Sequence, residues 1–365
     1  MMQTTSLLPT ILFWLLAIGL VLLPLLPAFS EWRSPTDVDP LPVVREHDGE
    51  ARAFALRFAD WLHTDARQAM QAAEARGDNR QTLMKGDHAF RLLGEPESWW
   101  PQQRHKAIHE GLLSSSELSV PDDAVCPWEV ASLSHLKLGR RVQVRAAVAG
   151  ADLTVGHDAR VGRWADATHT LRVLTGARLD GRCTAGTQIL LADDVSFSRL
   201  SAPTIKVAAE VEEGEGQARQ DITHQDWQPS RGEAIDDEGH TWRLSGNLTL
   251  PPRARVTVSL VVDGDLHIGQ GAWLQAPLKV KGRLTTDADV RFDGAVVSQG
   301  AMALGARCDV VGPVVGESQV LLGRAVHVGS LEALTTVTAQ EVTLSEAVCI
   351  HGSVWAREAG RVRRA

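Results

Sequence analysis

The sequence lacks an excess of positive charge. Its 365 residues include 37 Lys and Arg against 45 Asp and Glu, which gives a formal net charge of −8. Because a nucleic-acid binder needs a basic field over a large surface, this composition argues against nucleic acid as a partner. Tyr is absent, whereas the chain has 11 Trp and 31 Gly. This usage favours short strands separated by glycine turns over a long helical bundle, and so indicates a mainly β protein.

Cysteine is scarce and shows no pairing pattern. The four cysteines are Cys126, Cys183, Cys308 and Cys349. None belongs to a Cys-x-x-Cys pair, and none has a histidine nearby at a metal-ligand spacing, so the sequence predicts no metal site. We expect each to be a small buried hydrophobic residue in a β core.

The motifs of common catalytic centres are missing as well. The chain has no Gly-x-x-x-x-Gly-Lys phosphate loop, no Gly-x-Ser-x-Gly elbow and no His-Glu-x-x-His pair. The sequence therefore predicts neither catalytic nor cofactor-binding residues. We interpret the protein as a non-enzyme that needs no cofactor.

An uncharged apolar run extends from Leu7 to Phe29 near the N-terminus. As a helix it is long enough to cross a hydrocarbon core of about 30 Å. No basic residue precedes the run and no small-x-small cleavage site follows it, which favours an uncleaved anchor over a signal peptide. We therefore predict a single transmembrane helix within residues 1–30.

The side of the membrane follows from two weaker patterns. Arg33 and Arg45 come after the apolar run, and no Lys or Arg comes before it. The positive-inside rule then favours the cytoplasm for the rest of the chain. The scattered cysteines agree, because they do not form the disulfide framework of an oxidising compartment.

Residues 31–119 are predicted to form a helical stem and linker. Apolar residues recur there at the spacing that lines one face of a helix: Phe54, Phe58, Trp61 and Leu62. The helix is expected to end near Gly77 and to dock its apolar stripe on the β body or on a partner helix. The stretch from Gln81 to Leu118 is interpreted as mixed helix and loop.

A unit apolar-x-Gly-x-apolar recurs in the C-terminal part of the chain. Its copies are Val262–Leu266, Val280–Leu284, Phe292–Val296, Val310–Val314 and Ile350–Val354. The step from the first copy to the second is the same as the step from the third to the fourth. A short strand followed by a tight glycine corner forms one side of a coil, and such a coil buries its apolar face only by stacking on another coil. The 18-residue step therefore predicts a β-helix, or solenoid, with three-sided coils.

Two solenoid regions and an insertion follow from this pattern. We place the first region at residues 120–207 and the second at 241–358. Residues 208–240 are predicted to form an acidic loop insertion, and residues 359–365 a basic tail. The acids of the insertion lack the ordered spacing around a turn that calcium sites need, so we interpret them as a solvated run.

Several phrases of the repeat resemble those of bactofilins, the bacterial polymer-forming cytoskeletal proteins. They are Val262-Asp-Gly-Asp-Leu266-His-Ile268-Gly, Val280-Lys-Gly-Arg-Leu284, Ile350-His-Gly-Ser-Val354-Trp-Ala and, earlier in the chain, Asp193-Asp-Val195-Ser-Phe197. The resemblance implies a β-helix that self-assembles into polymers without nucleotide. It also implies a scaffold that positions partner proteins at the membrane, so the expected partners are the chain itself, the inner membrane and unidentified client proteins.

Two alternatives stay open. Val155-Gly-x-x-Ala159 and Val161-Gly-x-x-Ala165 also fit the hexapeptide repeat of left-handed β-helix acyltransferases, which place a histidine base between subunits. The candidate bases are His157, His169, His267, His327 and His351, and none has a carboxylate at a telling spacing. A polysaccharide-binding module is the second alternative, with tryptophans such as Trp273 and Trp355 as stacking surfaces.

The last coil is the predicted self-assembly interface. Its apolar residues are Val348, Ile350, Val354 and Trp355. No further repeat follows to cover them before the basic tail. An open coil end can add the strand of a neighbour edge to edge, so we expect these four residues to lie in the contact between copies.

Overall fold

The computed structural model describes residues 7–23, 51–100, 108–208, 223–229, 234–236 and 241–363. The chain divides into two units, Met1–Glu50 and Ala51–Ala365, and each is described by itself. The acidic residues Glu210, Glu212, Glu213 and Glu215 lie outside the described residues, as does Arg364 of the predicted basic tail.

The described residues of the first unit form the helix α1 (Leu7–Leu22), of 16 residues. It covers the first part of the predicted membrane span Leu7–Phe29, whose remaining residues 24–29 lie outside the described ranges. A search of the described residues finds no helix with the length and apolar character needed to cross a membrane. The transmembrane helix predicted from the sequence is therefore not found.

Helices also begin the second unit, and they confirm the predicted stem helix. A nearly continuous helical segment consists of α3 (Ala53–Trp61), the π-helical turn η2 (Leu62–Ala66) and α4 (Arg67–Arg76). It ends at Gly77, whose φ of 60° is the left-handed conformation that terminates many helices.

The stretch Gln81–Leu118, predicted as mixed helix and loop, contains three strands that the prediction missed. β1 (Thr82–Lys85) pairs antiparallel with β2 (His88–Leu92), and β2 pairs in parallel with β3 (Gly111–Ser114). The short helix α5 (Pro96–Trp99) lies between β2 and β3 in the chain. The prediction failed here because pairing with later coils, rather than local pattern, makes these residues strands.

The first solenoid begins at β3 rather than at residue 120. Its remaining strands run in parallel ladders and are β4 (Leu118–Val120), β5 (Val125–Ser132), β6 (Leu136–Leu138), β7 (Gln143–Ala149), β8 (Leu153–Val155), β9 (Arg160–Ala167), β10 (Thr170–Val173), β11 (Arg178–Ala185), β12 (Gln188–Leu191) and β13 (Ser196–Val207).

The second solenoid is built from shorter strands. They are β16 (Thr241–Leu244), β17 (Leu248–Leu250), β18 (Ala254–Val256), β19 (Ser259–Val262), β20 (Leu266–Ile268), β21 (Trp273–Leu274), β22 (Leu278–Val280), β23 (Leu284–Thr286), β24 (Arg291–Phe292), β25 (Val296–Ser298), β26 (Met302–Leu304), β27 (Asp309–Val310), β28 (Val314–Gly316), β29 (Gln319–Leu322), β30 (His327–Val328), β31 (Thr335–Leu344) and β32 (Cys349–Val362). Two short strands precede it, β14 (Gln225–Asp226), which pairs with β18, and β15 (Ala234–Asp236), which pairs with β16.

Together the coils form a β-solenoid of about 13 turns, which confirms the predicted architecture. One ladder of the second solenoid shows the regular step directly, because its successive partners are Leu248, Leu266, Leu284, Met302 and Val320. The last four of these side chains are buried. The interior of the coils is thus a stack of aliphatic side chains, as the repeat predicts.

Glycine recurs in the repeat because backbones meet closely at the corners. A Cβ atom added to Gly282 would lie 2.6 Å from the backbone carbonyl group of Gly264 in the preceding coil. A second type of corner adopts a positive φ, at Arg253, Gly271, Asp289, Arg307 and Ala325 in the second solenoid. The first corner excludes side chains sterically, whereas the second tolerates them at some conformational strain.

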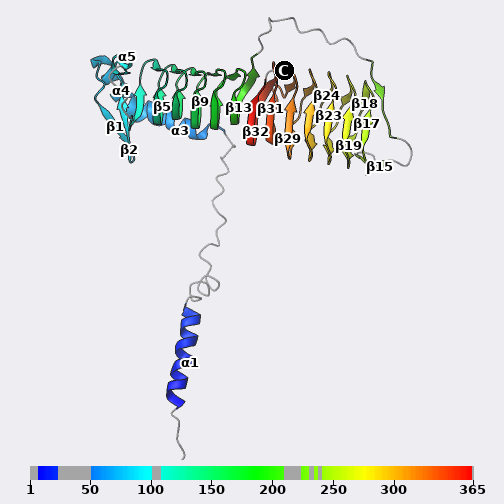
Figure 1. Cartoon of the computed structure of the whole chain (residues 1–365), viewed down its shortest axis with the longest axis horizontal. Coiled ribbons are helices and arrows are strands. Elements are labelled where there is room, and N and C mark those ends of the chain that lie inside the picture. Colours follow the sequence, from blue (N-terminus) through cyan, green and yellow to red (C-terminus); the bar gives the residue numbers. More distant parts are fainter. Residues whose placement is uncertain are drawn as a thin grey trace, which may run out of the picture. The chain divides into compact units, whose positions relative to one another are not determined.

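The two solenoids run in opposite directions along the body. In Figure 1 the first proceeds from β5 through β9 to β13, and the second proceeds from β17 and β18 back to β31 and β32, which lie next to β13. The two C-terminal coils therefore meet. The helical segment covers one flank of the first solenoid, where Phe58, Leu62 and Met70 pack against Leu113, Ala131 and Val148 in one buried cluster.

Candidate functional site at the junction of the solenoids

The two solenoids are joined by a strand pair between residues far apart in the sequence. β13 pairs antiparallel with β32, and the partners include Leu200 with Val354, Ile205 with Ile350, and Lys206 with Cys349. Within each solenoid the neighbouring coils pair in parallel instead. The change of direction marks the place where the end of one solenoid meets the end of the other.

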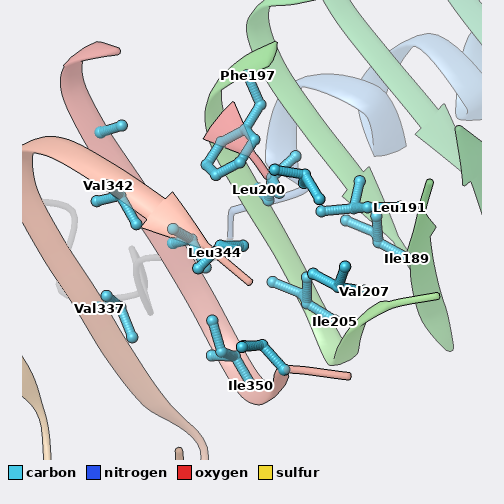
Figure 2. Close-up of a cluster of buried hydrophobic side chains, with 14 of the residues drawn as sticks. Ile189, Leu191, Phe197, Leu200, Ile205, Val207, Val337, Val342, Leu344 and Ile350 are labelled. Atoms are coloured by element: carbon cyan, nitrogen blue, oxygen red, sulfur yellow. The ribbon is translucent and has the colours of Figure 1, made fainter. Parts of the chain in front are cut away.

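Apolar side chains from both solenoids fill this junction. Figure 2 shows Leu200, Ile205 and Val207 of β13 facing the side chains of Ile350 and Leu344. Leu200, Ile350 and Leu344 are fully buried, and Ile205 is 1% exposed. The two interiors therefore form one continuous hydrophobic core.

The residues predicted for self-assembly all lie at this junction. Val348, Ile350 and Val354 are buried, and only Trp355 is exposed, at 47%. Arg199 of β13 lies over the Trp355 ring, 5.1 Å from its centroid. The premise of the prediction, an uncovered last coil, is therefore wrong, because β13 of the same chain covers it. The predicted basic tail is not free either, since β32 continues to Val362.

Tryptophans lie at the outer ends of both solenoids. Trp99 of α5 is buried in the core next to Trp100, and α5 contacts β4 in the first solenoid. In the second solenoid, Trp227 follows β14 and packs edge-on against Trp242 of β16. Large aromatic side chains thus shield the apolar interior where the stack of coils stops.

A hollow of about 460 Å³ opens at the junction, and we call it the junction hollow. It is lined by Thr204, Lys206, Val207, His327, Leu331, Ala347, Val348, Cys349 and His351. The strand register explains why residues from both solenoids lie together here, because Cys349 is the ladder partner of Lys206 on one side and of His327 on the other. Ile205 and Ile350 point into the core, so their neighbours in sequence point outward into the hollow.

His351 is held in a fixed orientation within the junction hollow. Its Nδ1 atom lies 3.0 Å from the carbonyl oxygen of Pro203 and therefore donates its hydrogen to that oxygen. The Nε2 atom then lies as an acceptor 3.6 Å from Sγ of Cys349. Burial raises the pKa of the Cys349 thiol, while the Lys206 ammonium acts in the opposite direction. The thiol is thus neutral at neutral pH, and Lys206 brings the positive charge.

All four cysteines are buried and free, as expected of small hydrophobic residues. Burial also raises the pKa of Cys126 and of Cys183 to about 12. Strand alternation places Cys349 and His351 on one face of β32. No local pattern in the sequence indicates that Cys349 also meets Lys206, because this ladder partner in β13 lies outside the local repeat.

The other candidate histidines do not gather with His327 and His351. His157 and His169 are exposed at turns. His267 is half-exposed, with Nε2 3.7 Å from a carboxylate oxygen of Asp287. The sequence analysis missed this pair because Asp287 lies on the next coil, just beyond Thr285, the ladder partner of His267. The general signal is that residues one coil apart in the sequence of a solenoid are neighbours in space.

Trp273, one of the two tryptophans proposed as stacking surfaces, contacts several other residues of the chain. Trp273 donates from Nε1 to an oxygen of Asp293 at 2.7 Å, and the guanidinium groups of Arg255 and Arg291 each lie 5.2 Å from its ring centroid. Its ring is therefore occupied by neighbours within the chain.

A second hollow, of about 310 Å³, lies on the outer face of the first solenoid. Its lining mixes charges of both signs, with Nδ1 of His135 3.5 Å from a carboxylate oxygen of Asp152. No set of three or more His, Cys, Asp or Glu within the described part of the chain is arranged to hold a metal ion.

In comparisons with known proteins, no family model, curated protein or solved structure matches the chain.

Proposed function

We propose that the protein is a non-enzymatic scaffold, in which two solenoids form one stiff body that holds partner proteins along its sides. The observation that carries the proposal is the antiparallel pairing of β13 with β32, which joins two separate repeat regions through one core. Side chains in such a close-packed interior transmit load rather than yield to it. A body of this kind suits the bactofilin-like role expected from the repeat phrases.

Self-association, the polymer-forming part of that role, requires an edge other than the last coil. β17 is the best candidate, since it pairs with β20 on one side, and the described residues place no strand on its other side. In contrast, the neighbouring strand β16 pairs with β15, and β18 pairs with β14.

The direction of the β17 backbone groups supports this edge. The Leu248 N–H donates to Asp265, and the Leu250 carbonyl accepts from Gly269, so both residues bond to the adjacent coil. Backbone groups alternate in direction along a strand, and those of Thr249 therefore face the open side. A strand from a second copy could pair there.

Sedimentation and negative-stain microscopy of the full chain in nanodiscs, without nucleotide, test this proposal. We expect assemblies in the wild type and in Thr249→Ala, and their loss in Thr249→Pro, which removes the outward donor but no hydrogen bond to the adjacent coil. Discrete monomers in the wild type would end the self-association proposal. Assemblies that persist in Thr249→Pro would place the contact elsewhere.

Attachment to a bacterial inner membrane remains part of the proposal, and the apolar sequence around α1 supports it. The helix has no charged residue, and its large side chains such as Leu12, Phe13 and Leu16 are more than half exposed. An alkaline carbonate wash of membranes tests attachment, because a peripheral protein is released and an inserted one is retained. A reporter active only in the periplasm, fused after Ala365, tests the cytoplasmic placement of the body.

A further inference from the structure

The junction hollow has the electrostatic character of an anion site. Its lining includes the Lys206 ammonium but no Asp or Glu. Within the described residues, no carboxylate lies within ion-pair distance of the Lys206 ammonium. The Thr204 hydroxyl adds a further donor beside His351, 3.4 Å from its Nδ1.

The lining of the junction hollow also includes apolar residues. Val207, Ala347 and Val348 line it from the strands and the corner before β32, and Leu331 lines it from a loop. Leu331 is 66% exposed, although it belongs to a coil whose other large apolar side chains are mostly buried. Among the described residues, no other side chain covers this exposed leucine, which makes it a contact surface beside the hollow.

The loop that supplies Leu331 is an interruption of the repeat. Val296 and Val314 are ladder partners at the regular step of the second solenoid. The next partner of Val314 is Val337, which lies later in the chain than the regular step would place it. The additional residues fall between β30 and β31 and include Leu331. The second solenoid therefore departs from its period at the coil that builds the junction hollow.

We infer that the junction hollow binds a small amphipathic carboxylate, with the charged group beside Lys206 and the Thr204 hydroxyl and the apolar tail against Leu331. The volume of about 460 Å³ lies within the range of about 300 to 1,000 Å³ that is usual for ligand sites. The convergence of a few polar groups within an apolar lining is also usual for such sites. This inference does not depend on the scaffold proposal, since a monomer contains the whole site.

Calorimetric titration of the full chain in nanodiscs with hexanoate tests the inference, with empty nanodiscs as the blank. Hexan-1-ol, which lacks the charge, and inorganic phosphate, which lacks the tail, serve as comparison probes. We expect saturable binding of hexanoate and at least tenfold weaker binding of either comparison probe.

Paired variants locate the binding site. Lys206→Met and Leu331→Ser should each weaken hexanoate binding about tenfold or more. Lys279→Met and Leu321→Ser should leave it unchanged, because these residues are also exposed on strands of the second solenoid but lie outside the hollow. All four side chains are exposed, so folding is preserved.

Three results would overturn the inference: no saturable binding of hexanoate, equal binding of phosphate, or equal losses in the hollow variants and their controls.

Discussion

The two solenoids share one coil design but use its outer surface differently. In the second, the short strands alternate buried and less buried residues, as in Leu266–Ile268 and Leu278–Val280. In the first, β9 and β11 each end in three consecutive buried residues. The helix α3 packs against this flank, where Phe54 and Phe58 contact Trp164 of β9 and Arg182 of β11 lies over the Phe54 ring. Regular alternation therefore marks a coil with a bare outer face, and its loss marks a face that another element covers.

The covering helices are fixed by a buried ion pair. Arg52, just before α3, contacts Asp166 of β9 with two hydrogen bonds of 2.9 and 2.8 Å. Asp166 is 2% exposed and also accepts from the Thr184 hydroxyl at 2.5 Å. Ion pairs on the bare second solenoid instead join exposed side chains, such as Arg307 with Asp289.

The largest effect is expected where the two solenoids meet. Val354→Lys buries a charge between β13 and β31, and should lower the free energy of unfolding by more than about 4 kcal/mol. Hydrogen exchange at β13 and β32 should accelerate most. The neighbouring variant Trp355→Lys is the control, with an expected loss below about 1 kcal/mol from one cation–π contact. Equal losses in the two variants would contradict the observed junction.

Asp166→Ala should have the next largest effect, because it leaves the Arg52 guanidinium without its carboxylate partner in a site that is mostly buried. We expect a loss of about 3 kcal/mol and faster hydrogen exchange in α3 and α4. Asp180→Ala, which breaks an exposed pair with Arg160 on the same solenoid, should lose less than about 1 kcal/mol. Unchanged exchange in the helices of Asp166→Ala would show that the apolar stripe alone holds them.

A pair of glycine substitutions compares a tight corner in the second solenoid with an open strand position in the first. Gly282→Ala in the second solenoid places a Cβ atom 2.6 Å from backbone and should lose about 2 kcal/mol. Gly162→Ala in the first solenoid meets only the Val144 carbonyl oxygen, at 3.7 Å, and should be neutral or slightly stabilising. Urea unfolding of both variants measures the difference, and a reversed order would refute the close approach of coils at Gly282.

The sequence predicts the coils well because their physics is local. An inward residue, a glycine corner and a constant step from coil to coil recur along the solenoid, and all three can be read along the chain. The apolar stripe of Phe58 and Leu62 similarly predicts the docked helix, although not the flank on which it docks.

The junction could not be predicted in this way. Ile205 and Ile350 are far apart in the sequence and meet in antiparallel register, and neither the repeat nor its interruption indicates which strand covers the last coil. The same long separation hides the junction hollow, since Lys206 and His351 belong to different solenoids. The prediction of an open last coil rested on the assumption that only a further repeat could cover it.

The smallest expected effect concerns the corner with positive φ. Ala325 occupies it with φ of 55°, whereas Gly176 occupies the corresponding corner of the first solenoid with φ of 76°. Ala325→Gly removes a steric strain of about 1 to 2 kcal/mol, and part of this gain is offset by the greater freedom of glycine in the unfolded chain. We therefore expect a net gain of roughly 0.5 kcal/mol and a slightly higher Tm in calorimetry. Ala303→Gly, in the regular strand β26, should instead lose about 0.5 to 1 kcal/mol. If both variants lose stability equally, the conformation of this corner does not limit the stability of the second solenoid.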